Sequence, residues 1–183
     1  MIGRTDRDGI AWLRLQHGEA SALDVELCDT IADVLTGLGS DPVRAVVITG
    51  QGRIFSAGVD LHRILDGGAA YVERFLPRMV AAFEAIFRCP KPVVAAVNGH
   101  AIAGGCIIAA AADYRLMAGG NERIGIPELL VGVPFPVSVL EIMRFTLPAH
   151  ELQPAVYTGA THLPDEALRR GFVDRLVDCE RLE

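Results

Sequence analysis

Two glycine-bearing segments of this sequence have residue types and spacing that could do chemistry. The first segment is 55–61 (Phe-Ser-Ala-Gly-Val-Asp-Leu), and the second is 98–106 (Asn-Gly-His-Ala-Ile-Ala-Gly-Gly-Cys). Glycine lets a ligand approach the main chain closely. A helix that begins at the glycine pair of the second segment presents unpaired N–H groups at the positive end of its dipole. This arrangement suits an oxygen that is, or becomes, negatively charged.

A structural interpretation of the glycine pair Gly104-Gly105 stands beside the chemical one. Its spacing does not match the dinucleotide-binding fingerprint, and it lacks the lysine and serine or threonine of a phosphate loop. Glycines here would also let a helix pack closely on a strand, so this stretch alone leaves both interpretations open. Ser56 lies within the first segment, but no His and Asp have the spacing of a nucleophile elbow with it.

The stretch 93–112 contains the elements that must position the glycine pair. Residues 93–97 are small and apolar without polar alternation, which predicts a strand buried on both faces. Asn98-Gly99 ends this strand with a turn. A run of small residues, 106–112, follows the glycine pair and predicts a buried helix. The sequence therefore predicts a strand, a tight turn, a glycine pair and a helix in succession.

Hydrophobic patterns in the rest of the chain predict alternating strands and helices. We expect strands at 10–15, 45–49, 113–117 and 172–177, and helices from Asp24 to Gly39, at 71–87, at 137–145, at 149–157 and from Pro164. Gly67-Gly68 should end a short helix capped by Asp60, and Pro77 should kink or divide the helix at 71–87. This alternation is typical of an α/β fold with a parallel or mixed sheet. The loop 50–61 then leaves the carboxyl end of a strand, where sites in such sheets lie.

Composition limits the class of protein. The chain has 183 residues, 51% of them hydrophobic, which favours a single domain, 1–183, with a sizeable core. Its net charge of −6 argues against nucleic acid as a partner, and no apolar run is long enough to span a membrane. The first residues lack the apolar block of a secretory signal. The four cysteines are scattered and the five histidines lack metal-ligand spacing, so we expect a cytoplasmic protein with reduced thiols and no metal.

With these segments placed, the chain resembles the crotonase family, also called the enoyl-CoA hydratase/isomerase family. Three segments carry the resemblance: 55–61, 98–106 and 126–132. Residues 158–160 and 167–177 are similar to a later helix and strand of the family, so the resemblance covers nearly the whole chain. It implies a spiral of strand–strand–helix units that binds acyl-CoA thioesters in fatty acid metabolism. It also implies a homo-oligomer, a trimer or dimer of trimers, without a cofactor, since coenzyme A is part of the substrate.

The resemblance also implies site residues. Two main-chain N–H groups, those of Val59 and Gly104, would hold the thioester oxygen and stabilise the negative charge that forms on it. Glu128 would be the catalytic acid and base. The resemblance places further residues along the substrate channel: Ala22, Ala57, Gly58, Asp60, Leu61, His62 and Ile107.

The number of carboxylates decides which reaction we expect. Hydratases of the family are similar in using two glutamates around a water, and here one of these positions is Ile107 and the other is Glu128. Hydration needs a water that is oriented and deprotonated, whereas one base can move a proton from C2 to C4 of a 3-enoyl thioester. Desolvation would raise the pKa of that carboxyl toward a useful value. We therefore expect a 3,2-enoyl-CoA isomerase, with a hydratase as the alternative.

Other interpretations of the same residues stay open. Without the family context, Glu128 would be a carboxylate in the first turn of a helix. His62 and Asp66 could supply a second polar group or could be surface residues, and Arg53 and Arg123 could meet the phosphates of coenzyme A.

The end of the sequence also bears on function. The chain ends at Glu183, whereas members of the family usually continue into C-terminal helices, so we expect a crotonase-like spiral that lacks this segment, either as a fragment or as a short form. A non-catalytic acyl-CoA-binding or assembly protein on the same scaffold is therefore a further alternative.

Overall fold

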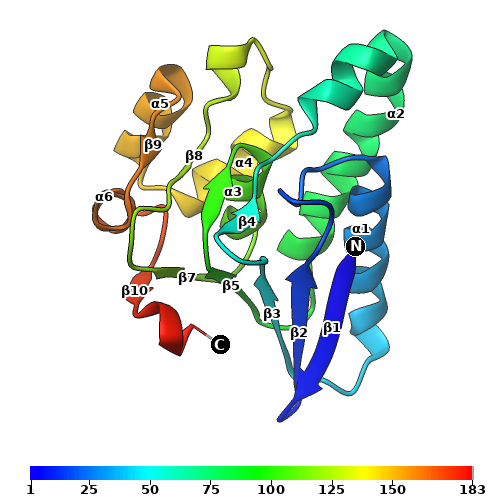
Figure 1. Ribbon diagram of the computed structural model, residues 1–183, viewed down its shortest axis with the longest axis vertical. Helices are drawn as coiled ribbons and strands as arrows, with labels where there is room; N and C mark the ends of the chain where they lie inside the picture. Colours follow the sequence, from blue (N-terminus) through cyan, green and yellow to red (C-terminus); the bar gives the residue numbers. More distant parts are fainter. Residues whose placement is uncertain (183) are drawn as a thin grey trace.

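A computed structural model, which describes residues 1–182, arranges the chain around two β-sheets (Figure 1). The larger sheet has the order β1-β2-β3-β5-β7-β10, in which β1 runs antiparallel to β2 and the other neighbours are parallel. Its strands are β1 (Ile2–Arg7), β2 (Ile10–Leu15), β3 (Ala45–Thr49), β5 (Val93–Val97), β7 (Tyr114–Ala118) and β10 (Arg175–Val177). The smaller sheet has the order β4-β6-β8-β9, with β8 and β9 antiparallel. Its strands are β4 (Ile54–Ser56), β6 (His100–Ile102), β8 (Ile124–Gly125) and β9 (Thr161–His162).

A strand–strand–helix unit connects the two sheets and recurs along the chain. In each unit the first strand joins the larger sheet, the second joins the smaller sheet, and a helix follows. The units are β3–β4–α2 (Leu61–Phe87), β5–β6–α3 (Gly104–Ala110) and β7–β8–α4 (Val137–Thr146). The expected α/β spiral of strand–strand–helix units is therefore confirmed.

The main core lies between the larger sheet and two helices, α1 (Val25–Gly37) and α2, which lie side by side in Figure 1. Both predicted apolar strands, β3 and β5, are buried there, and α1 and α2 bury Leu27 and Phe83 against them. Each large apolar side chain that is fully buried contributes roughly 1.5–3 kcal/mol. None of the helices within residues 1–182 combines the length and hydropathy that a membrane-spanning segment requires.

The smaller sheet corrects two expectations. Segment 50–61 was expected to be a loop, but it contains β4, and β6 separates the turn at Asn98-Gly99 from the glycine pair. These strands have two or three residues each, which is too short for a hydrophobic alternation to show in the sequence. Strand β1 was also not predicted. It is a charged edge strand in which Arg4 pairs with Asp6 and Asp41.

The helices follow the predictions closely, with one exception. Helices α4, α5 (Ala149–Thr158) and α6 (Pro164–Arg170) lie where they were expected, and the final strand, β10, is shorter than 172–177. Within α2 the helical dihedral angles fail at Gly68 (φ 58°, ψ −152°), as the glycine pair predicted. Of the two outcomes expected at Pro77, a kink or a division, the division does not occur, because Pro77 lies inside α2 between turns whose apolar face packs into the core.

Candidate active site

The two glycine-bearing segments meet where β4 and β6 end. Gly58 has a positive φ of 82°, and a Cβ atom added to it would lie 2.6 Å from the carbonyl oxygen of Ile102 and 2.9 Å from the nitrogen of Gly104. A Cβ atom added to Gly104 would lie 2.6 Å from the Leu23 side chain. Gly58 is therefore needed for close approach of the main chain, which brings the backbone of the first segment beside the start of α3, and Gly104 leaves room for the Leu23 side chain.

Ala103, the residue before α3, has an unusual backbone conformation. Its φ of 52° and ψ of −122° lie in a region that residues other than glycine rarely adopt. Such a conformation costs about 1–3 kcal/mol and persists when the surroundings enforce it. Here the Ala103 N–H donates to the carbonyl of Gly125 at 2.8 Å, which ties the turn to β8. The strain sets the direction in which α3 begins.

The main chain around Val59 is fixed by a bridge to Leu23. The Leu23 N–H donates to the carbonyl of Gly58 at 2.7 Å, and the Asp60 N–H donates to the carbonyl of Leu23 at 2.9 Å. Successive N–H groups of an extended chain point to opposite sides. The N–H of Val59 therefore points away from Leu23. Val59 also lines a cavity.

That cavity has a volume of about 40 Å³ and is almost wholly apolar. Glu128 is the one titratable side chain that lines it. The lining residues are Val59, Ile64, Phe75, Leu76, Met79, Phe83, Gly104, Ile107, Glu128, Val133, Pro134, Phe135, Pro136 and Val139. Four of the predicted site residues, Val59, Gly104, Ile107 and Glu128, thus come together around one small space. A larger surface depression of about 480 Å³, between the ends of α2 and α4, contains none of them.

Glu128 is held near the glycine turns by the smaller sheet. Strand β8 pairs with β6 through Ile102 and Gly125, and the chain then turns at Pro127 into a short 3₁₀ helix, Glu128–Val131. Glu128 is only 8% exposed. Glu128 does lie in the first turn of a helix, as the interpretation without the family context expected. Its side chain, however, lines the cavity.

The surroundings of Glu128 favour its protonated form. Burial raises the pKa of Glu128 to about 7, against a weaker opposing effect of its own backbone N–H. Within residues 1–182, its Oε2 atom has no hydrogen-bond partner. A carboxyl group with a pKa near the working pH can both take and return a proton. Because its Oε2 atom has no partner and its pKa is raised, Glu128 is the group of the cavity that can do acid–base chemistry.

Ile107 also lines the cavity, but its side chain is apolar, whereas that of Glu128 is ionisable. It follows Gly104 by one turn of α3, is buried and contributes hydrocarbon to the cavity wall. A second carboxylate at this position is therefore absent from the chain. The exposed side chains of His62 and Asp66 on α2 do not line the cavity either, so neither supplies a second polar group there.

The remaining residues predicted along the substrate channel lie outside the cavity lining. Gly58 is buried behind Val59, and Ala22 is half-buried beside Leu23. Asp60 is the N-cap of α2 and accepts a hydrogen bond from the Arg63 N–H at 3.1 Å. Ala57 is exposed directly after β4, and Leu61 and His62 are exposed at the start of α2. Their part in holding coenzyme A stays a prediction.

The two arginines considered for phosphate binding both have protein partners. Arg53 forms an ion pair with Glu122 at 2.8 Å, and the Arg123 side chain donates to Thr161. His100 accepts a hydrogen bond from the Arg123 N–H at 3.1 Å, so it packs the loop as a structural residue.

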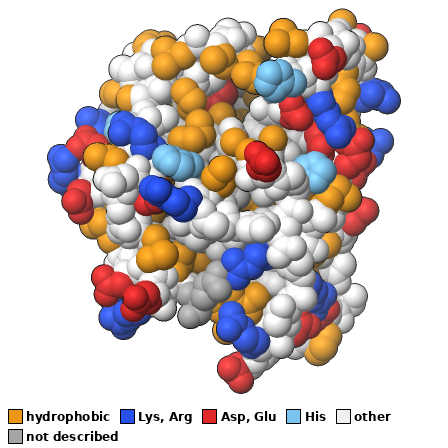
Figure 2. Space-filling view, in the orientation of Figure 1, with side chains coloured by type: hydrophobic (Ala, Val, Ile, Leu, Met, Phe, Trp, Pro, Cys, Tyr) orange, Lys and Arg blue, Asp and Glu red, His pale blue; other side chains and the backbone are white. Residues whose placement is uncertain are grey.

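The sequence did not reveal which residues form the far wall of the cavity. Phe75, Met79 and Phe83 repeat every four residues along α2, a spacing that predicted a helix face but not which face meets the site. Phe135 comes from the segment before α4. Figure 2 shows hydrophobic side chains gathered over the upper part of the molecule, where α2 and this segment lie in Figure 1.

Comparisons with known proteins agree with this arrangement. A family described as enoyl-CoA hydratase/isomerase matches residues 5–183. A carnitinyl-CoA dehydratase of Escherichia coli K12 is 36% identical over 181 residues, which cover 97% of this chain and 68% of that protein.

Solved structures show the same fold. A Mycobacterium tuberculosis protein is similar with a TM-score of 0.87 and 32% identity, over 99% of this chain and 78% of that one; it is described as an enoyl-CoA isomerase in one structure and as a probable enoyl-CoA hydratase in another. The human mitochondrial delta3-delta2-enoyl-CoA isomerase is similar with a TM-score of 0.94 and 25% identity, over 99% and 72%. Fold and site together define a crotonase-type α/β protein. The chain belongs to the enoyl-CoA hydratase/isomerase family.

Proposed function

We propose that this protein is a 3,2-enoyl-CoA isomerase in which Glu128 is the sole acid and base. The observation that carries the proposal is a single buried carboxyl group, with a pKa of about 7, in a cavity whose second-acid position is Ile107. The N–H groups of Val59 and Gly104 would bind the thioester oxygen of the substrate, because both residues line that cavity.

The reaction would proceed through a dienolate. Ionised Glu128 takes a proton from C2 of the 3-enoyl thioester, and the electron pair of that C–H bond spreads over C2, C4 and the thioester oxygen. The two main-chain N–H groups stabilise the charge on this oxygen as it forms, and donors that are already oriented need no reorganisation. Protonated Glu128 then returns the proton to C4, which leaves the double bond between C2 and C3.

The apolar cavity supports this scheme over the addition of water. Glu128 is the one carboxylate in its walls, so a water positioned for attack would lack the second carboxylate that orients it. The same surroundings keep the carboxyl group poorly solvated, which raises its pKa and strengthens it as a base when it is ionised.

A dehydratase or hydratase is the second candidate function, and a specific observation favours it. The protein from Escherichia coli that is 36% identical to this chain is named a carnitinyl-CoA dehydratase. Loss of a hydroxyl group from C3 needs a proton on the leaving oxygen as well as a base at C2. In this chain Glu128 would have to do both in turn.

An enoyl-CoA panel distinguishes these candidates. The isomerase proposal expects conversion of a 3-enoyl-CoA into the conjugated 2-enoyl-CoA, without addition of water to the 2-enoyl product. Water addition would favour the hydratase, and binding without any conversion would favour a non-catalytic acyl-CoA-binding protein. The panel needs no added metal or cofactor under this proposal.

Two variants locate the chemistry within the protein. Glu128→Gln should lower turnover by about 10³-fold, since a positioned acid–base group contributes 10²–10⁴-fold. Glu122→Gln is the matched control, because Glu122 is also buried but is paired with Arg53 outside the cavity. Wild-type turnover by Glu128→Gln would refute the assignment. The predicted trimer is tested separately by sedimentation velocity.

A further inference from the structure

Ser56, the last residue of β4, belongs to the first of the two segments that form the proposed oxyanion pocket and contacts the second at Gly105. It is 0% exposed, and its hydroxyl group is not part of the cavity. We propose that Ser56 is a positioning residue, whose hydroxyl group sets the direction of the Val59 N–H toward the thioester oxygen. This inference rests on the proposed function of the pocket.

The hydroxyl group makes two hydrogen bonds to the main chain. Its oxygen donates to the carbonyl of Ser21 at 2.7 Å and accepts from the N–H of Gly58 at 3.2 Å. The second bond holds the Ala57–Gly58 peptide unit, which is one unit before the peptide that carries the Val59 N–H. Together with the Leu23 bridge on the other side, it fixes the turn at Gly58, whose positive φ would otherwise be easy to change.

The main chain of Ser56 contacts the other arm of the pocket. A Cβ atom added to Gly105 would collide with the carbonyl oxygen of Ser56 and would lie 3.0 Å from its Cβ atom. Ser56 also pairs with Ala101 of β6 in the smaller sheet. One buried residue therefore fixes the distance between the Gly58 turn and the first turn of α3.

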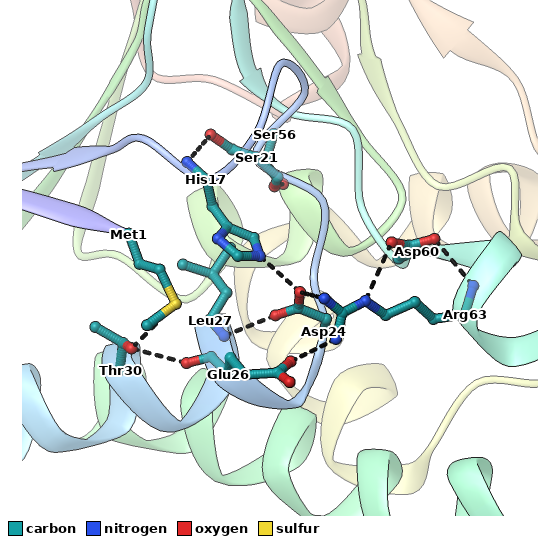
Figure 3. A network of polar contacts seen from close by, with 10 residues as sticks. All are labelled: Met1, His17, Ser21, Asp24, Glu26, Leu27, Thr30, Ser56, Asp60 and Arg63. Atoms are coloured by element: carbon teal, nitrogen blue, oxygen red, sulfur yellow. Dashed lines mark hydrogen bonds and ion pairs between the residues drawn. The ribbon is translucent and has the colours of Figure 1, made fainter. Parts of the chain in front are cut away.

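Further polar contacts hold the loop that accepts the Ser56 hydrogen bond (Figure 3). Asp24 is buried next to it, accepts a hydrogen bond from the Leu27 N–H at 2.8 Å, and lies 2.6 Å from the ring of His17. The Ser21 hydroxyl accepts a weak hydrogen bond from the His17 N–H at 3.4 Å. The network thus holds the 17–24 loop from the side opposite to Ser56, so the Ser21 carbonyl is a firm anchor.

Removal of the hydroxyl group would leave the Ser21 carbonyl and the Gly58 N–H without their partner. Buried groups that lose a partner shift until they find another. A displacement of 1 Å at a catalytic centre can cost about 10²-fold in rate, and loss of a whole oxyanion donor costs about 10²–10³-fold. We therefore expect Ser56→Ala to lower kcat about tenfold and to change KM less than about twofold, since N–H direction matters most in the transition state.

The test compares wild type, Ser56→Cys and Ser56→Ala, because a thiol is a weaker donor and acceptor than a hydroxyl group. Two experiments are done on each protein. The first measures kcat and KM on a 3-enoyl-CoA, and the second measures the absorption maximum of a bound acyl-CoA with an extended conjugated chain. Strong hydrogen bonds to the thioester oxygen shift that maximum to longer wavelength. Both the shift and kcat should fall in the order Ser, Cys, Ala.

Thr49→Val is the matched control. The Thr49 hydroxyl is also buried and donates to a main-chain carbonyl, that of Ala96 at 2.9 Å, but it lies outside the cavity. This variant should lose stability and keep the wild-type kcat and absorption shift. If Ser56→Ala does not fold, wild type against Ser56→Cys carries the test.

A wild-type kcat and absorption shift in the Ser56 variants would overturn the positioning role while leaving the pocket intact. If the wild-type protein itself binds the probe without a shift and does not convert a 3-enoyl-CoA, the proposed function fails first, and the two failures are thereby distinguished.

Discussion

Asp24 and Glu128 are both buried carboxylates, and the structure treats them in opposite ways. Asp24 is 2% exposed and Glu128 is 8% exposed. Burial by itself would raise the pKa of Asp24, yet its hydrogen bonds with Leu27 and His17 and the charge of Arg63 hold that pKa below its usual value. Burial without such partners raises the pKa of Glu128 to about 7. Partners rather than burial therefore separate a carboxylate that stabilises the fold from one that can react.

Loss of the Asp24 side chain should have the largest effect on stability. Asp24→Ala removes the N-cap of α1 and the partner of His17, and a lost cap together with a broken buried pair costs about 3 kcal/mol in unfolding free energy. Urea denaturation at neutral pH measures the change. A loss below about 0.5 kcal/mol would show that Asp24 is replaceable and would break the comparison.

Glu128→Gln should change stability in the opposite direction. The pKa of Glu128 is raised on folding, so its ionisation destabilises the folded state, and the penalty grows as the pH rises from the unfolded pKa to the folded pKa. At about pH 8.5 the variant should be more stable than wild type by roughly 1–3 kcal/mol, and near pH 4.5 the difference should vanish. Denaturation at both pH values checks this. Equal stability at high pH would mean that the carboxyl group is solvated.

The same pKa predicts how the rate depends on pH. Only ionised Glu128 can take the C2 proton, so kcat/KM should rise about tenfold per pH unit below about pH 7 and level off above it. Asp24, with its lowered pKa, stays ionised throughout this range. A midpoint near pH 4.5 would contradict the raised pKa of Glu128.

Removal of one partner of Asp24 should have the smallest effect. His17→Ala leaves the Leu27 hydrogen bond and Arg63 in place, and the loss of one charge-assisted hydrogen bond costs about 1–2 kcal/mol in unfolding free energy. Denaturation compared with Asp24→Ala measures how far the network compensates. A loss as large as that of Asp24→Ala would show that His17 provides most of the stabilisation.

The sequence predicted the surroundings of Glu128 better than those of Asp24. Glu128 and the two glycine segments could be found because each is a local motif with distinctive residue types, and the isoleucine at 107 could be counted from the glycine pair. Asp24 was predicted as the start of a helix, since that start shows in the residues that follow it. Its ring partner at His17 depends on the path of the intervening loop, which the sequence pattern does not determine.

Contacts over long sequence separations explain the other omissions. The strands of the smaller sheet gain their hydrogen bonds from segments far away in the chain, as when β4 pairs with β6. The Ser56 hydroxyl bonds to a residue 35 positions earlier. The apolar face of α2 was correctly predicted, but its role as the cavity wall follows from tertiary packing.

The central claim is that one carboxyl group carries the same proton from C2 to C4 inside a dry cavity. A 3-enoyl-CoA with deuterium at C2, converted in ordinary water, tests this claim most directly. The account predicts that the 2-enoyl-CoA product carries deuterium at C4 and that Glu128→Gln forms this product about 10³-fold more slowly. Product with only ordinary hydrogen at C4, formed at the wild-type rate by Glu128→Gln, would contradict it.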